Sequence, residues 1–396
     1  MRTIGVQERR ARLGVRHLLA PGTAVEDVTD VARAVVVLHA TDPATVVLSA
    51  LARMARPDPS AMEAALYDDR SLVRILGMRR TLFTMPRETV PVVQASSALR
   101  VAADERRKLE QMLVDGGITK RPGPWLRKVE AKALAALDEL GEASAPELAA
   151  AVPELDLRLT LSPGQRWEAK VRLSSRVLLL LGVDGHVVRG RPKGAWTGAT
   201  HRWVPTARWL GGPIEAMDPD AARVELVRRW LARFGPGTVR DLQWWTGWTL
   251  GATRAALAEL DTVEVDLDGE VGLVLAEDEA PAPEAGPWVA LLPGLDPTPM
   301  GWKERDWYLG PHKARVFDTA GNVGPTVWVD GRIVGGWAQR KDGSVVTRLL
   351  EDVPRTRTKQ IDRAAAALED LIGKVPSIPR FPAPLDKELR AEGPTP

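Results

Sequence analysis

Residues 38–43 have the sequence Leu-His-Ala-Thr-Asp-Pro and separate two segments with helical periodicity. Apolar residues recur with helical spacing from position 28 to position 35, and His39 continues the same stripe. The pair Asp42-Pro43 is typical of the N-cap and first residue of a helix, because a proline there has no N–H group to leave unpaired. We therefore expect His39 to end one helix and Thr41 to stand just before the next.

This helix–helix corner is the best candidate active site in the chain. Helix ends leave unpaired backbone groups, and the side chains of His39 and Thr41 are expected to point toward the same place. We predict that these two residues are catalytic and that Asp42 supports them. A structural role is the alternative, because a histidine on an apolar stripe is more often a core residue and a threonine before Asp-Pro is ordinary capping chemistry.

The composition limits the kinds of chemistry that the protein can perform. At 396 residues the chain is long enough for two to four domains. Arginine accounts for 42 of the 54 basic residues, which favours phosphate binding, although a GC-rich genome would also enrich arginine. The absence of cysteine excludes disulfides, thiol catalysis and cysteine-ligated zinc. The five histidines are scattered, so we expect neither a metal site nor another cofactor.

Targeting signals are absent from the sequence pattern. The first ten residues have no apolar core of the kind that a signal peptide needs, and no apolar run reaches membrane-spanning length. We therefore expect a cytoplasmic protein that does not contact a membrane and that associates with the nucleoid when it binds DNA.

Helical segments followed by short hairpins occur three times along the chain. Hairpins are expected at residues 72–86 and 185–205, and at 263–275 around Asp268-Gly269. Helices before a small hairpin are typical of a winged helix-turn-helix. After a linker at 277–286, four short strands at regular spacing predict a small barrel.

The fold class predicted from this pattern is α+β, with three tandem winged helix-turn-helix units followed by a small C-terminal β-barrel. The predicted boundaries are residues 1–86 for the first unit, 87–124 for a connecting helix, 125–210 for the second unit, 211–280 for the third, and 287–396 for the barrel with a terminal helix. We expect the proline-rich end to pack loosely.

Basic residues on the predicted hairpins are candidate DNA contacts, because phosphate neutralisation dominates affinity for DNA. These candidates are Arg79, Arg80, Arg189, Arg191, Lys193, Arg202 and Arg332. A solvated strand edge is the alternative for each of them. Asp296 is expected either to support the active site electrostatically or to shape the Asp296-Pro297 turn. Trp244, Trp245 and Trp248 are expected to lie mostly in the core, and stacking on DNA bases is the alternative.

Four stretches carry a resemblance to a known family. They are Leu38-His-Ala-Thr-Asp-Pro43, Met78-Arg-Arg-Thr-Leu-Phe83, Leu291-Leu-Pro-Gly-Leu-Asp296 and Trp328-Val-Asp-Gly-Arg-Ile-Val-Gly-Gly-Trp337. In combination they resemble the AlkZ/YcaQ-type winged-helix DNA glycosylases over most of the chain. The resemblance implies three winged helices and a β-barrel around duplex DNA. It also implies a catalytic signature of Gln or His, an apolar residue, then Gln or Asp; here His39 fits this signature and Thr41 departs from it.

The function predicted from this resemblance is that of a monofunctional DNA glycosylase. Its substrate is expected to be duplex DNA carrying N7-alkylated purines, including bulky or cross-linked adducts, whose N-glycosidic bond a monomeric enzyme would hydrolyse. One alternative is a non-catalytic winged-helix DNA-binding protein, acting as a regulator or damage sensor. Another is a fold retained for protein interaction alone.

The chemistry expected at His39 depends on the charge of its imidazole ring. An N7-alkylated purine is already cationic, so the enzyme must supply a flipped nucleotide, stabilisation of the sugar cation and a positioned water. A neutral His39 can position that water and accept its proton, a contribution of about 10²–10⁴-fold. The C-terminus of a helix would instead favour the imidazolium, which would repel the sugar cation.

Overall fold

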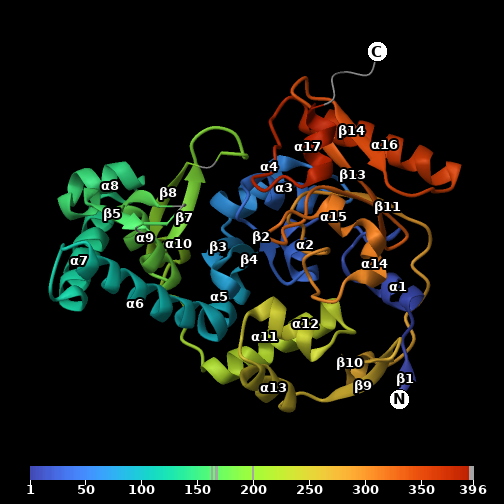
Figure 1. Ribbon diagram of the computed structural model, residues 1–396, viewed down its shortest axis with the longest axis horizontal. Helices are drawn as coiled ribbons and strands as arrows, with labels where there is room; N and C mark the ends of the chain where they lie inside the picture. The colour runs from blue at the N-terminus through green and yellow to red at the C-terminus, as the bar shows by residue number, and fades with distance from the viewer. Residues whose placement is uncertain (162–163, 166–167, 199, 392–396) are drawn as a thin grey trace.

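The computed structural model describes residues 1–161, 164–165, 168–198 and 200–391. It combines helices with several small sheets (Figure 1), so the α+β prediction is confirmed. A mainly helical lobe lies at the left of Figure 1, and the C-terminal sheet lies at the upper right. Most of the N-terminal region lies in the centre, with its first helix at the lower right. No helix in the described part of the chain is long and apolar enough to cross a membrane.

The N-terminal region contains four helices and a three-stranded antiparallel sheet in the order β2-β4-β3. The helices are α1 (Val6–Arg16), α2 (Val28–Ala34), α3 (Pro43–Leu51) and α4 (Pro59–Glu63), and the strands are β2 (Leu38–His39), β3 (Leu72–Leu76) and β4 (Leu82–Pro86). The predicted hairpin at residues 72–86 is therefore confirmed. Its tip is a short 3₁₀ turn over Met78–Arg80.

The position of His39 differs from the prediction, because α2 ends at Ala34 and His39 lies in strand β2. The run Val35-Val36-Val37 follows the helix, and β-branched side chains favour extended backbone over helix. Val36 also has a φ of 64°, which breaks the helical path. His39 then pairs with Phe83 of β4. The predicted helix–helix corner is therefore a strand–helix corner.

Helix α3 begins where the sequence predicts. The Asp42 side chain accepts a hydrogen bond from the Ala44 N–H at 3.0 Å, and Pro43 is the first helical residue. The second carboxylate oxygen of Asp42 accepts a hydrogen bond from the N–H of Arg380 at 2.9 Å. Burial raises the pKa of Asp42, and the N–H donors of Arg380 and Ala44 oppose that rise. Asp42 thus ties the start of α3 to a segment near the C-terminus.

The lobe at the left of Figure 1 has a hydrophobic core of its own, formed by residues between 109 and 203. Ser144 and Glu147 form a capping box at the start of one of its helices. The lobe contains α6 (Leu99–Asp115), α7 (Pro122–Leu140), α8 (Ala145–Ala151), β5 (Arg158–Leu161), β6 (Ala169–Arg172), α9 (Leu173–Val183), β7 (Val187–Pro192), β8 (His201–Pro205) and α10 (Thr206–Leu210). The helix predicted from Arg87 is interrupted, since α5 (Val90–Val93) and a π-helical turn precede α6.

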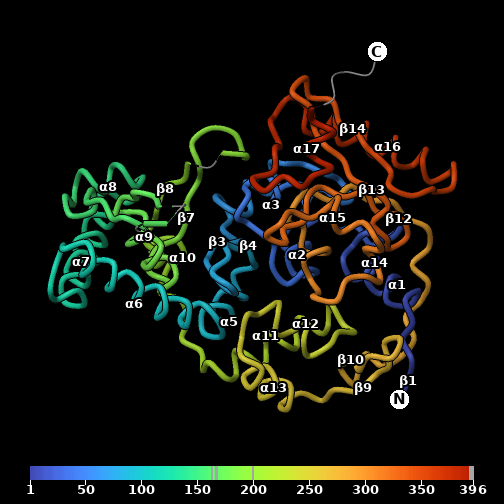
Figure 2. Tube along the Cα trace, viewed as in Figure 1, coloured from blue at the N-terminus to red at the C-terminus, as the bar shows by residue number. Residues whose placement is uncertain are grey.

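The next region contains three helices and a hairpin, as predicted. These are α11 (Pro219–Phe234), α12 (Val239–Thr246), α13 (Leu250–Ala258), β9 (Thr262–Leu267) and β10 (Glu270–Leu275). Asp268 and Gly269 both have positive φ, at 55° and 98°, as a two-residue hairpin turn requires. The sequence did not predict strand β1 (Arg2–Thr3), which pairs in parallel with β9 and runs beside the hairpin in Figure 2.

The C-terminal region forms an open four-stranded antiparallel sheet in the order β11-β12-β13-β14, so the predicted closed barrel is wrong. The strands are β11 (Val289–Leu292), β12 (Thr326–Val329), β13 (Arg332–Gln339) and β14 (Val345–Leu349), and the helices are α14 (Asp306–Leu309), α15 (Lys313–Val316), α16 (Arg355–Ile372) and α17 (Pro384–Ala391). Helix α16 packs against both edge strands, and this contact replaces closure.

The proline-rich end is more ordered than the sequence predicts. Helix α17 packs on β13 and buries Leu385 and Leu389. The last five residues, 392–396, lie outside the described part of the chain.

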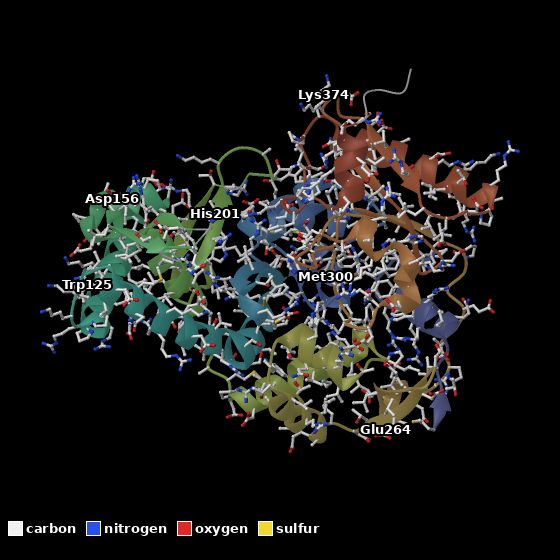
Figure 3. The ribbon with its side chains drawn as sticks, in the orientation of Figure 1. Trp125, Asp156, His201, Glu264, Met300 and Lys374 are labelled. Atoms are coloured by element: carbon white, nitrogen blue, oxygen red, sulfur yellow. The ribbon has the colours of Figure 1, made fainter. Side chains whose placement is uncertain are left out.

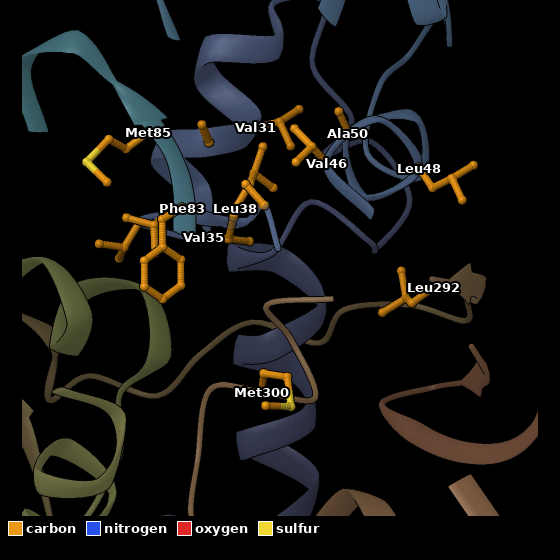
Figure 4. Packing of buried hydrophobic residues seen from close by; sticks show 14 of the residues in the cluster. Val31, Val35, Leu38, Val46, Leu48, Ala50, Phe83, Met85, Leu292 and Met300 are labelled. Atoms are coloured by element: carbon orange, nitrogen blue, oxygen red, sulfur yellow. The ribbon is translucent and has the colours of Figure 1, made fainter. Parts of the chain in front are cut away.

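A large hydrophobic core joins the N-terminal region, helices α11–α13 and the C-terminal sheet. Figure 4 shows part of it, with Val35, Leu38 and Phe83 close together. Its N-terminal and C-terminal parts are linked by a fully buried ion pair: Asp296 accepts two hydrogen bonds from Arg53, at 2.7 and 2.9 Å. The guanidinium of Arg53 also donates to the backbone carbonyls of His17 and Ser49, so the charges are well compensated.

We expect the change Asp296→Asn to destabilise the protein by about 3–5 kcal/mol, because it leaves the Arg53 cation buried without its counter-ion. Thermal unfolding followed by tryptophan fluorescence measures the loss. The matched control is Arg56→Ala, since the exposed ion pair of Arg56 with Glu26 lies near the same helix end and such pairs contribute about 0–1 kcal/mol. Equal melting temperatures for the two variants would contradict the stabilising role of the buried pair.

Candidate active site

The tip of the β3–β4 hairpin directs two neighbouring arginines in different directions. Arg79 and Arg80 both have positive φ, at 54° and 60°, an uncommon conformation for residues other than glycine. The Arg79 guanidinium lies over the ring of Trp244, 4.5 Å from its centroid. Arg80 instead forms an ion pair with Glu105 of α6 at 3.0 Å. Of these two predicted DNA contacts, only Arg79 faces the same cleft as His39.

A cleft of about 520 Å³ brings His39 together with residues from three separate parts of the chain. Met300, which Figure 3 shows near the centre of the molecule, is part of its wall. The cleft is strongly cationic. Its basic side chains are Arg79, Arg240, Lys303, Arg305 and Lys313, whereas its carboxylates are those of Glu304 and Asp306. The aromatic side chains Trp244 and Phe317 complete the lining.

His39 is almost fully buried at this cleft, with 9% of its surface exposed. Its ring packs edge-on against Phe83, with the centroids 5.1 Å apart. Burial lowers the pKa of His39 to about 3; the positive charge of Arg79 also lowers it, and the negative charge of Asp296 opposes them. The imidazole is therefore neutral at pH 7. The helix C-terminus that would favour the imidazolium is not there, because His39 lies in a strand. Its Nδ1 atom is buried without a hydrogen-bond partner among the described residues.

Thr41 is half-buried and does not belong to the described lining of the cleft. Strand β2 ends at His39, so the alternation that puts every second strand residue on one face does not continue to Thr41. Asp42 caps α3, as described above. Asp296 accepts a hydrogen bond from the Thr298 N–H at 2.9 Å, which shapes the turn at Asp296-Pro297. It also binds Arg53, and its charge opposes the lowering of the His39 pKa; its support of the active site stays a prediction.

The far wall of the cleft is held by two aspartates that the sequence did not single out. The buried Asp241 accepts hydrogen bonds from the N–H groups of Lys303 and Glu304, at 2.8 and 2.9 Å. Asp318 accepts three hydrogen bonds from the backbone of Ala320 and from the backbone and side chain of Asn322. Backbone N–H groups held in this way give the wall a defined shape.

The remaining predicted DNA contacts lie away from this cleft, and most pair with carboxylates of the protein itself. Arg191 pairs with Asp68 at 2.7 Å, and Arg332 pairs with Glu351 at 2.7 Å. Arg202 pairs with both Glu142 and Glu147.

Two basic residues of the β7–β8 hairpin, Arg189 and Lys193, form no such ion pair among the described residues. The guanidinium of Arg189 lies 5.4 Å from the ring centroid of Trp203. Burial, together with the charges of Arg74 and Arg380, lowers the pKa of Arg189 to about 10. Lys193 is exposed. The hairpin therefore does not present four converging free charges.

Trp244 is the one of the three tryptophans that lines the cleft. Trp245 and Trp248 are buried as predicted, but Trp244 is half-buried and faces the cleft. Its position in α12, one residue before the buried Trp245, was the available signal, because neighbouring helix residues face different directions. Arg305, which lies 4.8 Å from the Trp244 centroid, had no distinguishing pattern. No cluster of metal-binding side chains occurs among the residues that the structure describes.

Parts of the four stretches quoted above meet around helix α3 and strand β2. The Ala40 N–H donates to the Leu82 carbonyl at 2.9 Å. The Thr45 hydroxyl donates to the Gly294 carbonyl at 2.6 Å. The Trp337 indole donates to the Leu292 carbonyl at 2.9 Å. These segments are far apart in sequence, so their combination reflects one packed unit.

Comparisons with known proteins agree with this arrangement. The family model "DNA glycosylase AlkZ-like" matches residues 32–371. An interstrand DNA cross-link repair glycosylase from Streptomyces sahachiroi is 30% identical over 162 residues, which cover 38% of this chain and 42% of that protein. The solved structure of the Streptomyces sahachiroi DNA glycosylase AlkZ has the same fold, with a TM-score of 0.72 and 21% identity over 96% of this chain and 99% of that one. The chain therefore belongs to the AlkZ-like DNA glycosylase family.

Proposed function

We propose that this protein is a monofunctional DNA glycosylase that hydrolyses the N-glycosidic bond of alkylated purines in duplex DNA. The observation that carries the proposal is a neutral imidazole at the base of a cationic cleft. The cations suit the phosphates of a DNA strand, and the uncharged ring does not repel the sugar cation that forms as the base leaves. Membership of a glycosylase family supports hydrolysis over DNA binding alone.

The role proposed for His39 is to position the attacking water. A neutral imidazole has one nitrogen that accepts a hydrogen bond and one that donates. Because the pKa of His39 is lowered to about 3, the ring is a weak base, and orientation of the water is its main contribution. The N7-alkylated base leaves without protonation, so this chemistry needs no separate general acid. Thr41 is not required to touch the water in this scheme.

The binding part of the proposal extends to the whole chain. Three winged units are proposed to contact a duplex without reading its sequence, because phosphate contacts position a protein but do not specify bases. A monomer in the cytoplasm is part of the same proposal. The cross-link repair activity in the name of the Streptomyces sahachiroi relative makes bulky and cross-linked purines suitable substrates to test beside N7-methylguanine.

We expect His39→Ala to slow base release by about 10²-fold, because the attacking water loses the group that positions it, with duplex affinity nearly unchanged. His39→Gln should retain part of the activity, because an amide also orients water by hydrogen bonds. The measurement is single-turnover release of N7-methylguanine from a duplex, together with the melting temperature of each variant. Thr41→Val is the matched control and should change the rate less than about threefold, since Thr41 lies outside the cleft lining.

A purely structural role for His39 predicts a different result. His39→Ala would then lower the melting temperature and the DNA affinity together, and the unmodified protein would release no base from any adduct. That outcome would favour the non-catalytic DNA-binding alternative.

The stability of the protein should depend on pH through His39. The folded state keeps His39 neutral down to about pH 3, whereas the unfolded chain takes up a proton near pH 6.5. Protonation of His39 in the unfolded chain therefore does not lower the free energy of unfolding above pH 6.5, and lowers it progressively as the pH falls toward 3. The stability of His39→Gln relative to wild type should therefore rise by up to about 2 kcal/mol between pH 7 and pH 5. Denaturant unfolding at both pH values measures this difference, and a constant difference would contradict a buried neutral ring.

A further inference from the structure

Two arginines in the cleft share one aromatic ring. The guanidinium carbon of Arg79 lies 4.5 Å from the Trp244 ring centroid, and that of Arg305 lies 4.8 Å from the same centroid. Arg305 also lies 4.8 Å from the centroid of Phe317. The two cations come from segments more than 200 residues apart, the β3–β4 hairpin tip and the loop before α14. Packing against aromatic faces fixes their positions without neutralising their charge.

The backbone holds Arg79 in this position at some cost. Its φ of 54° lies in the left-handed region, which is strained for an arginine, and such strain concentrates at functional sites. Gly247, with a φ of 72°, ends α12 directly beneath the Arg79 side chain. A Cβ atom at Gly247 would lie 2.6 Å from the Cγ of Arg79. Any side chain at position 247 would collide with Arg79, so this packing requires a glycine there.

Arg79 and Arg305 differ from several of the predicted DNA contacts in whether a carboxylate of the protein neutralises them. Arg80, Arg191 and Arg332 each pair with a carboxylate of the protein. Within the described ranges, no ion pair with a carboxylate occurs for Arg79 or Arg305. The cleft carboxylate of Glu304 is bound to Arg240 at 2.9 Å, and that of Asp306 is exposed. Their distances from the shared Trp244 centroid place the two guanidinium carbons at most 9.3 Å apart. Two cations this close favour an anion that reaches both of them.

We infer that Arg79 and Arg305, supported by Trp244, form a clamp for one backbone phosphate of the DNA strand whose nucleotide enters the His39 cleft. The inference rests on the DNA-binding part of the proposed function. A phosphodiester carries one negative charge and two free oxygens, so each guanidinium can donate to it. Its charge would offset the repulsion between the two arginines.

Electrostatics within the cleft agree with an anion at this place. Burial and the charge of Arg305 lower the pKa of Arg79 to about 10, so the free protein holds the pair in an unfavourable environment. The charge of Arg79 is also felt at His39. A bound phosphate would weaken the lowering of the His39 pKa by Arg79. DNA binding would therefore change the electrostatic environment of the ring that is proposed to position the water.

The test uses a duplex with one tetrahydrofuran abasic site, which has no N-glycosidic bond to hydrolyse. Each phosphate within three nucleotides of that site is replaced, one at a time, by an uncharged methylphosphonate. For wild type, we expect one position to weaken binding by about tenfold, the value for a charge-assisted hydrogen bond. Arg79→Gln and Arg305→Gln should each bind the unmodified duplex about tenfold more weakly. Each should also respond less than wild type at that position, because only one of the two cationic partners of the phosphate remains.

Arg80→Gln is the matched control, because Arg80 lies on the same hairpin tip but pairs with Glu105; it should keep the wild-type pattern of responses. Trp244→Phe keeps an aromatic face for both guanidinium groups and should therefore weaken the response less than Trp244→Ala does. Melting temperatures verify that each variant is folded. The clamp is wrong if both arginine variants respond to that phosphate as strongly as wild type does. It is also wrong if wild type responds to no phosphate.

Two further outcomes separate the clamp from the proposed function. If the protein releases no base but shows the predicted pattern of responses, the result supports the clamp and contradicts the catalytic proposal. Competition by orthophosphate at the arginine pair, with no effect of any methylphosphonate, would assign the pair to a free anion and overturn the clamp.

Discussion

The ion pair between Arg53 and Asp296 is the contact on which the position of the cleft depends. It fastens the loop after β11 to the end of α3, and the residues that follow in that loop form the far wall opposite His39. Removing two charges from water is costly unless both are fully compensated. Here the Arg53 guanidinium has further acceptors in the carbonyls of His17 and Ser49 and in the Thr298 hydroxyl, so several parts of the chain must be in place together.

Local signals predicted much of the secondary structure, whereas long-range pairing determined the site. The helix start at Asp42 was predictable because a cap acts within three residues. The strand position of His39 was not predictable, because a two-residue strand depends on pairing with β4, which lies more than forty residues later. The barrel prediction failed because strand spacing does not reveal that α16 covers the sheet edges. The division into winged units stays a prediction.

The electrostatic character of the cleft follows from burial as much as from charge. The sequence suggested His39 as the candidate and the resemblance suggested its role, but neither predicted the protonation state, which depends on desolvation and on Arg79. The other basic candidates illustrate the same limit, because sequence alone does not distinguish an arginine that faces DNA from one paired with its own protein. Arg202, bound to both Glu142 and Glu147, is the clearest example.

The parallel pairing of β1 with β9 has a consequence for biosynthesis. Arg2 and Thr3 lie beside Val265 and Asp266, and the buried Ile4 shares a small core with Val265 and Val274. During translation, strand β1 therefore leaves the ribosome more than 250 residues before its partner strand. Contacts of such long sequence separation form slowly, and an exposed strand segment is prone to wrong pairing in the meantime. Early folding of this chain must proceed with its N-terminal strand unpaired, and completion of the β9–β10 hairpin is the event that secures it.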